Sequence, residues 1–219
     1  MRLTDEEKAM LAGELGEPRR WAITHQVTVG EFFDAADFVA VSQAHVMADT
    51  ESLGEAGVCF LEGLAGAPEP ERRVRVPAIT DPRGIDFAVY RRLGQSVAMA
   101  ALERRAIAAL TAFGVLMTDT CINYQTVMAP LRGEHVAYGD TGAVVYSNSM
   151  LGARSNFEGG PSALAAALTG APRATPITSP VAAAPPGGSA SRRGRATSAN
   201  GVRWAASSVR PAAPIGRSR

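Results

Sequence analysis

The sequence is poor in cysteine and has no long apolar stretch, and each absence excludes a class of protein. Its two cysteines, Cys59 and Cys121, cannot form the framework of a disulfide-rich secreted domain, so we expect a reducing, cytoplasmic setting. Because no run of 18 apolar residues occurs, we expect no transmembrane helix and no membrane partner. The acidic N-terminus MRLTDEEKAML is also unlike a secretory signal peptide.

Motifs that would identify a common enzyme class are missing as well. The sequence has no P-loop, no Gly-x-Gly-x-x-Gly motif after a strand, and no His-Glu-x-x-His or Cys-x-x-Cys motif. It also lacks the Gly-x-Ser-x-Gly elbow of serine hydrolases. The sequence therefore lacks the motifs that are typical of nucleotide-binding proteins, zinc enzymes and serine hydrolases.

Acidic residues are absent from the last part of the chain. Residues 1–170 carry 14 Lys and Arg against 21 Asp and Glu, whereas residues 171–219 carry 8 Arg, no acidic residue and 7 of the 14 prolines. Such a segment cannot bury enough apolar surface to offset its ordering entropy, so we predict a globular part over 1–170 and a disordered basic tail over 171–219. The arginines could contact phosphates, but they are dispersed and only Trp204 is available for stacking, so we do not expect a nucleic-acid partner.

The globular part alternates helical and strand-like patterns. Capping boxes, Thr4 with Glu7 and Ser52 with Glu55, mark the starts of two helices, and Gly114 marks the end of a third. Helices are expected over 5–11, 18–30, 53–64, 96–113 and 162–168, and short strands over 38–41, 74–76 and 115–117. This alternation predicts an α/β fold, a layered and mainly parallel sheet with flanking helices.

Polar residues follow each predicted strand, at 42–45, 80–81 and 118–121. Sites in such folds gather at the carboxyl ends of the strands, so this convergence is a first indication of a site. Cys121 could be a metal ligand or a small buried residue, and Cys59, inside a helix, is a poor partner for an iron–sulfur cluster. His45 could be an acid, a base or a structural residue. The segment 146–161 could bind a carboxylate through Arg154 or form a capped loop before the next helix.

Several segments together resemble a known family. They read LTDEEKAMLAGELGEPRRWA, VSQAHVMADTESLGEAG, VRVPAITDPRGIDF, MTDTCINYQ, RGEHVAYGDTGAVVYSNS and GARSNFEGGPSALAAALTG. They are similar to the large-subunit domain of aconitase X, a diverged branch of the aconitase superfamily. The resemblance is continuous over residues 1–170, and its last three segments are the most specific.

The resemblance implies a hydro-lyase with an iron–sulfur cluster between a large part and a small swivelling part, which is a subunit in some members. Bacterial members are cis-3-hydroxy-L-proline dehydratases and archaeal ones are phosphomevalonate dehydratases. By this resemblance Cys121 is a cluster ligand, and His45 and Glu134 lie near the site as candidate catalytic residues. The open iron would activate a substrate hydroxyl, and the base that removes the proton is not assigned. The residues expected to face the hydroxy-acid substrate are Ser147, Asn148, Ser149, Arg154, Ser155 and Asn156.

The resemblance stops after Gly170. Relatives continue with a segment like GRTPRYGYHL, whereas this chain reads GAPRATPITSP, and the family's remaining cluster cysteines lie downstream of the matching region. We interpret residues 171–219 as the product of a frameshift in a GC-rich gene. Three functions therefore remain open. The first is an iron–sulfur-dependent dehydratase of the aconitase X family acting on a small hydroxy acid such as cis-3-hydroxy-L-proline, the second is a truncated, inactive fragment of such an enzyme without a cluster, and the third is an activity like that of a phosphomevalonate dehydratase large subunit.

Overall fold

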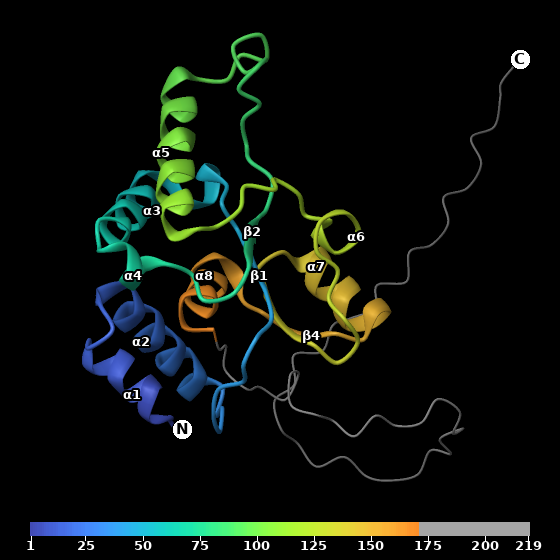
Figure 1. Ribbon diagram of the computed structural model, residues 1–219. Helices are drawn as coiled ribbons and strands as arrows, with labels where there is room; N and C mark the ends of the chain where they lie inside the picture. The colour runs from blue at the N-terminus through green and yellow to red at the C-terminus, as the bar shows by residue number, and fades with distance from the viewer. Residues whose placement is uncertain (171–219) are drawn as a thin grey trace, which may run out of the picture. The chain divides into compact units, whose positions relative to one another are not determined.

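The computed structural model describes residues 1–170, which form a parallel sheet with helices on both faces (Figure 1). The strands are β1 (Ala44–Val46), β2 (Ala78–Thr80), β3 (His135–Tyr138) and β4 (Arg154–Phe157). Their order in the sheet is β2-β1-β3-β4, and every pairing is parallel. The predicted α/β class is therefore confirmed. The predicted disordered tail at 171–219 lies outside the described residues.

Helices surround this sheet and connect its strands. They are α1 (Asp5–Ala12), α2 (Glu17–Phe32), α3 (Thr50–Ala65), α4 (Glu69–Arg72), α5 (Val97–Phe113), α6 (Asn123–Thr126), α7 (Thr141–Tyr146), the π-helical turn η1 (Ser147–Leu151) and α8 (Gly159–Thr169). The predicted capping box of α1 is present, with the Thr4 hydroxyl 3.2 Å from the amide of Glu7. Gly114 ends α5 in the left-handed region, at φ +86°. Within residues 1–170, no helix is long and apolar enough to cross a membrane.

The strand predictions are wrong in position. The strands β1 and β2 begin at Ala44 and Ala78, later than the predicted runs 38–41 and 74–76, and of the run 115–117 only Leu116 forms a bridge, to Ile79. The earlier extended segments bond to the ends of helices instead. The Val41 amide donates to the carbonyl of Gly170, and the Val74 amide donates to the carbonyl of Phe113.

The start of α3 also differs from the prediction. Asp49 is the N-cap, because its Oδ1 accepts from the amide of Ser52 at 2.7 Å. The backbone at Gly54 is non-helical (φ 58°, ψ −174°), so a kink separates Ser52 from the rest of the helix. The predicted capping box of Ser52 with Glu55 is therefore replaced by an aspartate cap three residues earlier.

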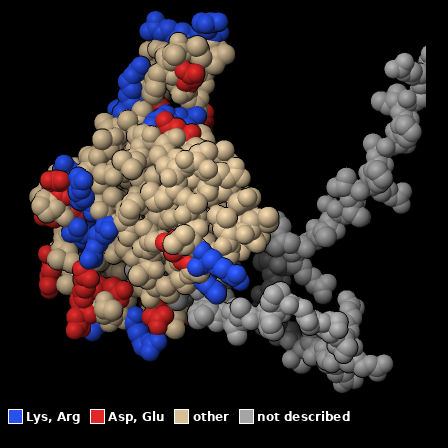
Figure 2. Space-filling view, turned by 45° about the vertical axis from the view of Figure 1, so that its right-hand side comes forward, with Lys and Arg blue, Asp and Glu red and all other residues tan. Residues whose placement is uncertain are grey.

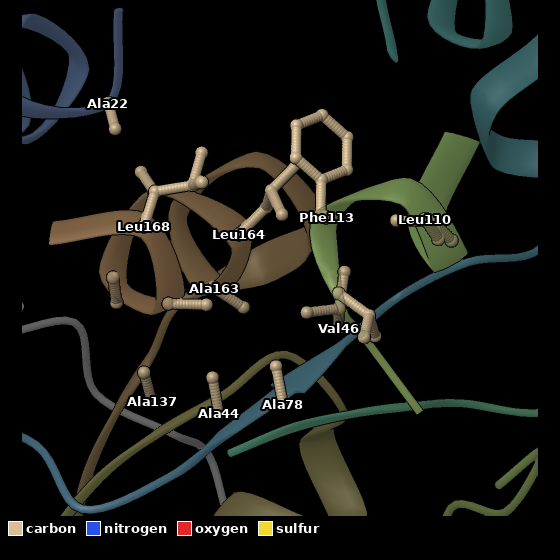
Figure 3. Packing of buried hydrophobic residues seen from close by; sticks show 14 of the residues in the cluster. Ala22, Ala44, Val46, Ala78, Leu110, Phe113, Ala137, Ala163, Leu164 and Leu168 are labelled. Atoms are coloured by element: carbon tan, nitrogen blue, oxygen red, sulfur yellow. The ribbon is translucent and has the colours of Figure 1, made fainter. Parts of the chain in front are cut away.

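The main core lies between the sheet and α8 (Figure 3). Ala44, Ala78 and Ala137 present small side chains on one face of the strands, and Leu164 and Leu168 of α8 lie above them. Phe113 and Leu110 of α5 close the same cluster. Small residues on both sides let the helix approach the sheet closely. Because side chains alternate along a strand, His45, Val136 and Tyr138 point to the other face of the sheet, towards α6 and α7.

The side of the molecule that carries α6 and α7 has a broad surface with few charged groups (Figure 2). Large apolar side chains are exposed in this part of the sequence, at Leu116, Ile122, Val127, Leu131, Val145 and Met150. An accumulation of exposed apolar side chains of this kind is typical of a protein–protein contact. Charged residues gather instead around α1 and α4 and near the loop before α5 (Figures 1 and 2).

The close packing of α8 against the sheet can be tested by substitution. Ala166 is fully buried, so Ala166→Leu forces extra methylene groups into a filled space and should lower the free energy of unfolding by about 1–3 kcal/mol. The matched control is Ala101→Leu on the exposed side of α5, for which we expect a change within about 0.5 kcal/mol. Urea unfolding of the two variants measures the difference, and equal midpoints would contradict this packing.

Candidate functional site

One aspartate follows each of three neighbouring strands at the carboxyl edge of the sheet. Asp49 comes after β1, Asp81 directly after β2, and Asp140 after β3. Asp49 and Asp140 cap α3 and α7, because each Oδ1 accepts an amide hydrogen at 2.7 Å, from Ser52 and Ala143 respectively. The strand–helix connections thus place three carboxylates around one edge of the sheet.

Asp81 differs from the other two aspartates because it caps no helix. It is only 7% exposed, and its Oδ1 has no hydrogen-bond partner among residues 1–170. Burial, reinforced by the negative charges of Asp140 and Asp49, raises the pKa of Asp81 to about 6. Its carboxyl group can therefore hold or release a proton near neutral pH.

His45 lies beside this carboxyl group. It is fully buried in β1, and its Nε2 is 3.8 Å from Oδ1 of Asp81 and 2.9 Å from the carbonyl oxygen of Thr120. The carbonyl can only accept, so Nε2 carries the proton and Nδ1 is left as an acceptor in the neutral ring. Burial lowers the pKa of His45, against the opposing effects of the Thr120 carbonyl and Asp140. Both members of the His45–Asp81 pair are thus shifted towards their neutral forms.

Cys121 follows Thr120 in the chain and carries an exposed, free thiol. The hydrogen bond from His45 to Thr120 therefore brings two predicted site residues, His45 and Cys121, to the same edge of the sheet. Cys59 does not join them, because its Sγ contacts Glu55 and Arg105, each at 3.4 Å, between α3 and α5.

The described residues do not fit a complete metal centre. Among residues 1–170, no group of three or more His, Cys, Asp or Glu side chains is placed to hold a metal ion. An iron–sulfur cluster needs several protein ligands, usually thiolates. The described part of the chain offers one exposed thiol at the site, Cys121, and does not by itself complete a cluster.

Glu134 and Arg154 lie at the opposite, amino edge of the sheet. Glu134 precedes β3, and Arg154 opens β4 in register with His135. His45 pairs with Tyr138, four residues after Glu134, so the backbone places Glu134 about 13 Å away from His45 at ~3.3 Å per residue. The Glu134 carboxylate accepts from the amide of Leu131 at 2.5 Å. The structure therefore does not bring Glu134 and Arg154 to the edge that holds His45 and Cys121.

Asn148 binds the backbone of the edge strand β4. Its Oδ1 accepts from the amide of Ser155 at 3.0 Å, and its Nδ2 donates to the carbonyl of Ser155 at 2.9 Å. This side chain thereby satisfies backbone groups of an outer strand that would otherwise be unpaired. The amide of Asn148 is used to hold the fold together.

The neighbouring predicted substrate residues are also engaged with backbone groups or buried. The hydroxyl of Ser155 accepts from the amide of Tyr138 at 3.1 Å and donates to the carbonyl of Asn156 at 2.7 Å. Ser149 donates to the carbonyl of Val145 at 2.5 Å. Ser147 and Asn156 are buried. The segment is not the capped loop that the sequence allowed, because it forms η1, β4 and the start of α8, which has no side-chain cap. A substrate role for these residues stays a prediction.

Comparison with known proteins adds independent information. The family model described as "Aconitase X first domain" matches residues 1–176. The phosphomevalonate dehydratase large subunit of Methanothermobacter thermautotrophicus is 38% identical over 165 residues, which are 75% of this chain and 41% of that relative. The cis-3-hydroxy-L-proline dehydratase of Pseudomonas aeruginosa is 30% identical over 77% of this chain and 28% of its own length.

A solved structure shows the same fold. The holo-form of Thermococcus kodakaraensis aconitase X superposes with a TM-score of 0.73 at 31% identity, covering 81% of this chain and 43% of that chain. The chain thus spans about two-fifths of the length of the phosphomevalonate dehydratase large subunits that it matches, 41% and 42% of the first two.

The raised pKa of Asp81 predicts a pH dependence of stability. The folded chain holds this proton up to about pH 6, whereas the unfolded chain releases it near the ordinary pKa of 3.8. Ionisation of Asp81 therefore lowers the free energy of unfolding as the pH rises from about 4 to about 6. Asp81→Asn removes this loss, so the variant should exceed the wild type by about 1–3 kcal/mol at pH 7 and match it near pH 4.

Urea unfolding between pH 4 and pH 8 measures this difference. His45 acts in the opposite direction, because its lowered pKa contributes stability that is lost as the pH falls below about 6.5, but both proteins share it. Glu14→Gln, at an exposed carboxyl group of the N-terminal region, is the control and should show no such dependence. A difference between Asp81→Asn and wild type that is independent of pH would contradict the burial of this charge.

Proposed function

The chain belongs to the aconitase X family, and we propose that it forms part of an iron–sulfur-dependent hydro-lyase that dehydrates a small hydroxy acid such as cis-3-hydroxy-L-proline. The observation that carries this proposal is the family match over residues 1–176, which includes the edge where Cys121, His45 and Asp81 meet. Its curated relatives are named dehydratases.

The charge of the site supports an amino acid as the substrate. Asp49, Asp81 and Asp140 surround the carboxyl edge of the sheet, and the carboxylates of Asp49 and Asp140 each accept a backbone amide there. A site with this excess of negative charge attracts the ammonium group of a hydroxyproline and repels a phosphate. The second candidate substrate is phosphomevalonate, which is favoured by the higher identity, 36–38%, to the large subunits named for it.

Dehydration requires a proton to leave one carbon and a hydroxyl group to leave its neighbour. Asp81 can exchange a proton near neutral pH, and Nε2 of the neutral His45 ring lies 3.8 Å from its Oδ1. Cys121 is proposed as one ligand of the cluster, which would supply Lewis-acid activation of the hydroxyl group when bound. Because residues 1–170 do not complete a cluster, the remaining ligands have to come from outside them.

We propose a second polypeptide as the source of the missing parts. Several relatives are named large subunits, which implies a small subunit in those enzymes. The uncharged surface on the side of α6 and α7, with its exposed apolar side chains, supports a protein partner for this chain (Figure 2). Free thiols at Cys59 and Cys121 support a reducing, cytoplasmic location.

The competing proposal is that the chain is a truncated, inactive fragment with no cluster. It is supported by the coverage of about two-fifths of the large-subunit relatives, 41–42%, and by the lack of a complete ligand set among residues 1–170. The change of composition at residue 171 supports the proposal that residues 1–170 are the N-terminal part of the catalytic domain and that a frameshift produced the rest. Resequencing the gene across the codons for Gly170 and Ala171 tests this, and an intact frame with relatives that share the tail would contradict it.

Iron and acid-labile sulfide content separates the two proposals. After anaerobic purification we expect iron in the wild-type chain and in Cys59→Ser, and its loss in Cys121→Ser, because only Cys121 lies at the carboxyl edge beside His45. Iron in the wild type would be followed by a dehydration assay with cis-3-hydroxy-L-proline and with phosphomevalonate. Absence of iron from all three proteins would contradict the dehydratase proposal for this chain and support the inactive fragment.

A further inference from the structure

The loop 118–121 is held to the end of β2 by one residue, Thr80. Its Oγ1 accepts from the amides of Thr118 and Asp119, at 3.1 and 3.2 Å, and donates to Oδ1 of Asp119 at 3.1 Å. Its carbonyl accepts from the amide of Thr120 at 3.2 Å and from the hydroxyl of Thr118 at 3.0 Å. The buried Thr80 thus contacts three successive residues of the loop.

Asp119 adopts a backbone conformation that a non-glycine residue rarely takes. Its φ is +51°, in the left-handed region, so the surrounding contacts must hold it there. Arg83 supplies the charged contact, with Nε 2.9 Å from Oδ2 and Nη2 2.7 Å from Oδ1 of Asp119. The Arg83 side chain is only 9% exposed, whereas that of Asp119 is 41% exposed, so the two-point contact is shielded from water on the arginine side alone.

The loop connects the Arg83–Asp119 contact to His45 and to the thiol of Cys121. Immediately after Asp119, the carbonyl of Thr120 accepts from Nε2 of His45 at 2.9 Å, and Cys121 presents its exposed thiol. A loop that left its left-handed turn at Asp119 would move the carbonyl that fixes the ring proton of His45. It would also move the thiol. The geometry of both groups therefore depends on the conformation of Asp119.

We propose that Arg83 is a positioning residue, which holds Asp119 in its left-handed conformation and thereby fixes the hydrogen bond of His45 and the place of the Cys121 thiol. The importance of the thiol rests on the proposed function, whereas the effect on the loop and on His45 does not. Arg83 would thus act on the site without touching substrate or cluster.

A purely structural role for Arg83 has to be distinguished from this one. Its Nη1 also lies 3.9 Å from Oε1 of Glu103, a fully buried carboxyl group that accepts from the hydroxyl of Thr50 at 2.6 Å. If Arg83 served only to compensate Glu103, its loss would lower global stability and leave the loop unchanged. The test therefore needs a local signal and a global one.

Hydrogen exchange followed by ¹⁵N NMR on the full, metal-free chain supplies both signals. The variant is Arg83→Met, which keeps a long unbranched stem, and Arg83→Lys tests rescue by a single charged contact. The control is Arg105→Met, which removes another arginine that binds two carboxylates, Glu55 and Glu62, on the outer side of α3 and α5. The Ala137 amide, bonded to the carbonyl of Gln43 inside the sheet at 3.0 Å, reports global opening.

We expect Arg83→Met to accelerate exchange at the amides of Thr118 and Asp119 by about tenfold or more relative to Ala137. The hydrogen-bonded Nε2–H signal of His45 should broaden or move upfield, with partial recovery in Arg83→Lys and no effect in Arg105→Met. Unchanged loop amides and an unchanged His45 signal in a folded Arg83→Met would overturn the proposal. If that variant does not fold, Asp119→Asn removes the carboxylate that Arg83 contacts and keeps a residue that tolerates the left-handed region. Unchanged loop amides and an unchanged His45 signal in that variant would overturn the proposal.

Because these measurements use the metal-free chain, their results do not depend on whether the chain has the proposed function. A released loop in a protein that never binds iron would support the positioning role and contradict the dehydratase proposal for this chain. If Arg83→Met retains iron and its loop is unchanged, the result would support the dehydratase proposal and contradict the positioning role. The two failures are therefore distinguishable.

Discussion

The parallel register of the sheet is the constraint on which the site depends. Because β1, β2 and β3 run in the same direction, their carboxyl ends meet, and the aspartates that follow them converge around His45. Two of these carboxylates are stabilised as helix caps, which leaves Asp81 as the member whose charge is poorly compensated. The same edge receives the loop that carries Cys121. An antiparallel arrangement of these strands would have scattered the same residues over both edges of the sheet.

The fold was predictable where the signals were local. The capping box at Thr4 and the glycine stop at Gly114 identify the ends of α1 and α5, because caps act within one turn of helix. The strands were misplaced, because three- and four-residue strands carry little periodicity and neighbouring extended segments have a similar composition. Val41 and Val74 are apolar and extended, and only tertiary structure shows that they bond to helix ends. The strands β3 and β4, in a segment rich in polar residues, were missed.

The candidate site was predictable in part. His45 and Cys121 do reach the same edge, through the carbonyl of Thr120, as the polar residues after the predicted strands suggested. The sequence marks Asp81 only as a polar residue after a strand, because its burial and the charges of Asp49 and Asp140 that raise its pKa come from segments distant in sequence. Glu134 and Arg154 lie at the other edge, because they precede or open their strands. An aspartate that follows an apolar run and precedes a helix was the available signal for Asp49 and Asp140.

The central claim is that the ends of three strands bury an acidic group beside His45. The most direct test is a ¹³C NMR titration of the Asp81 side-chain carboxyl group in the wild-type chain, with Asp81→Asn to assign the signal. The account predicts an inflection near pH 6, because burial and the neighbouring carboxylates disfavour the charged form. An inflection near the ordinary value of 3.8 would show that Asp81 is solvated, and would contradict a buried acidic site at this edge of the sheet.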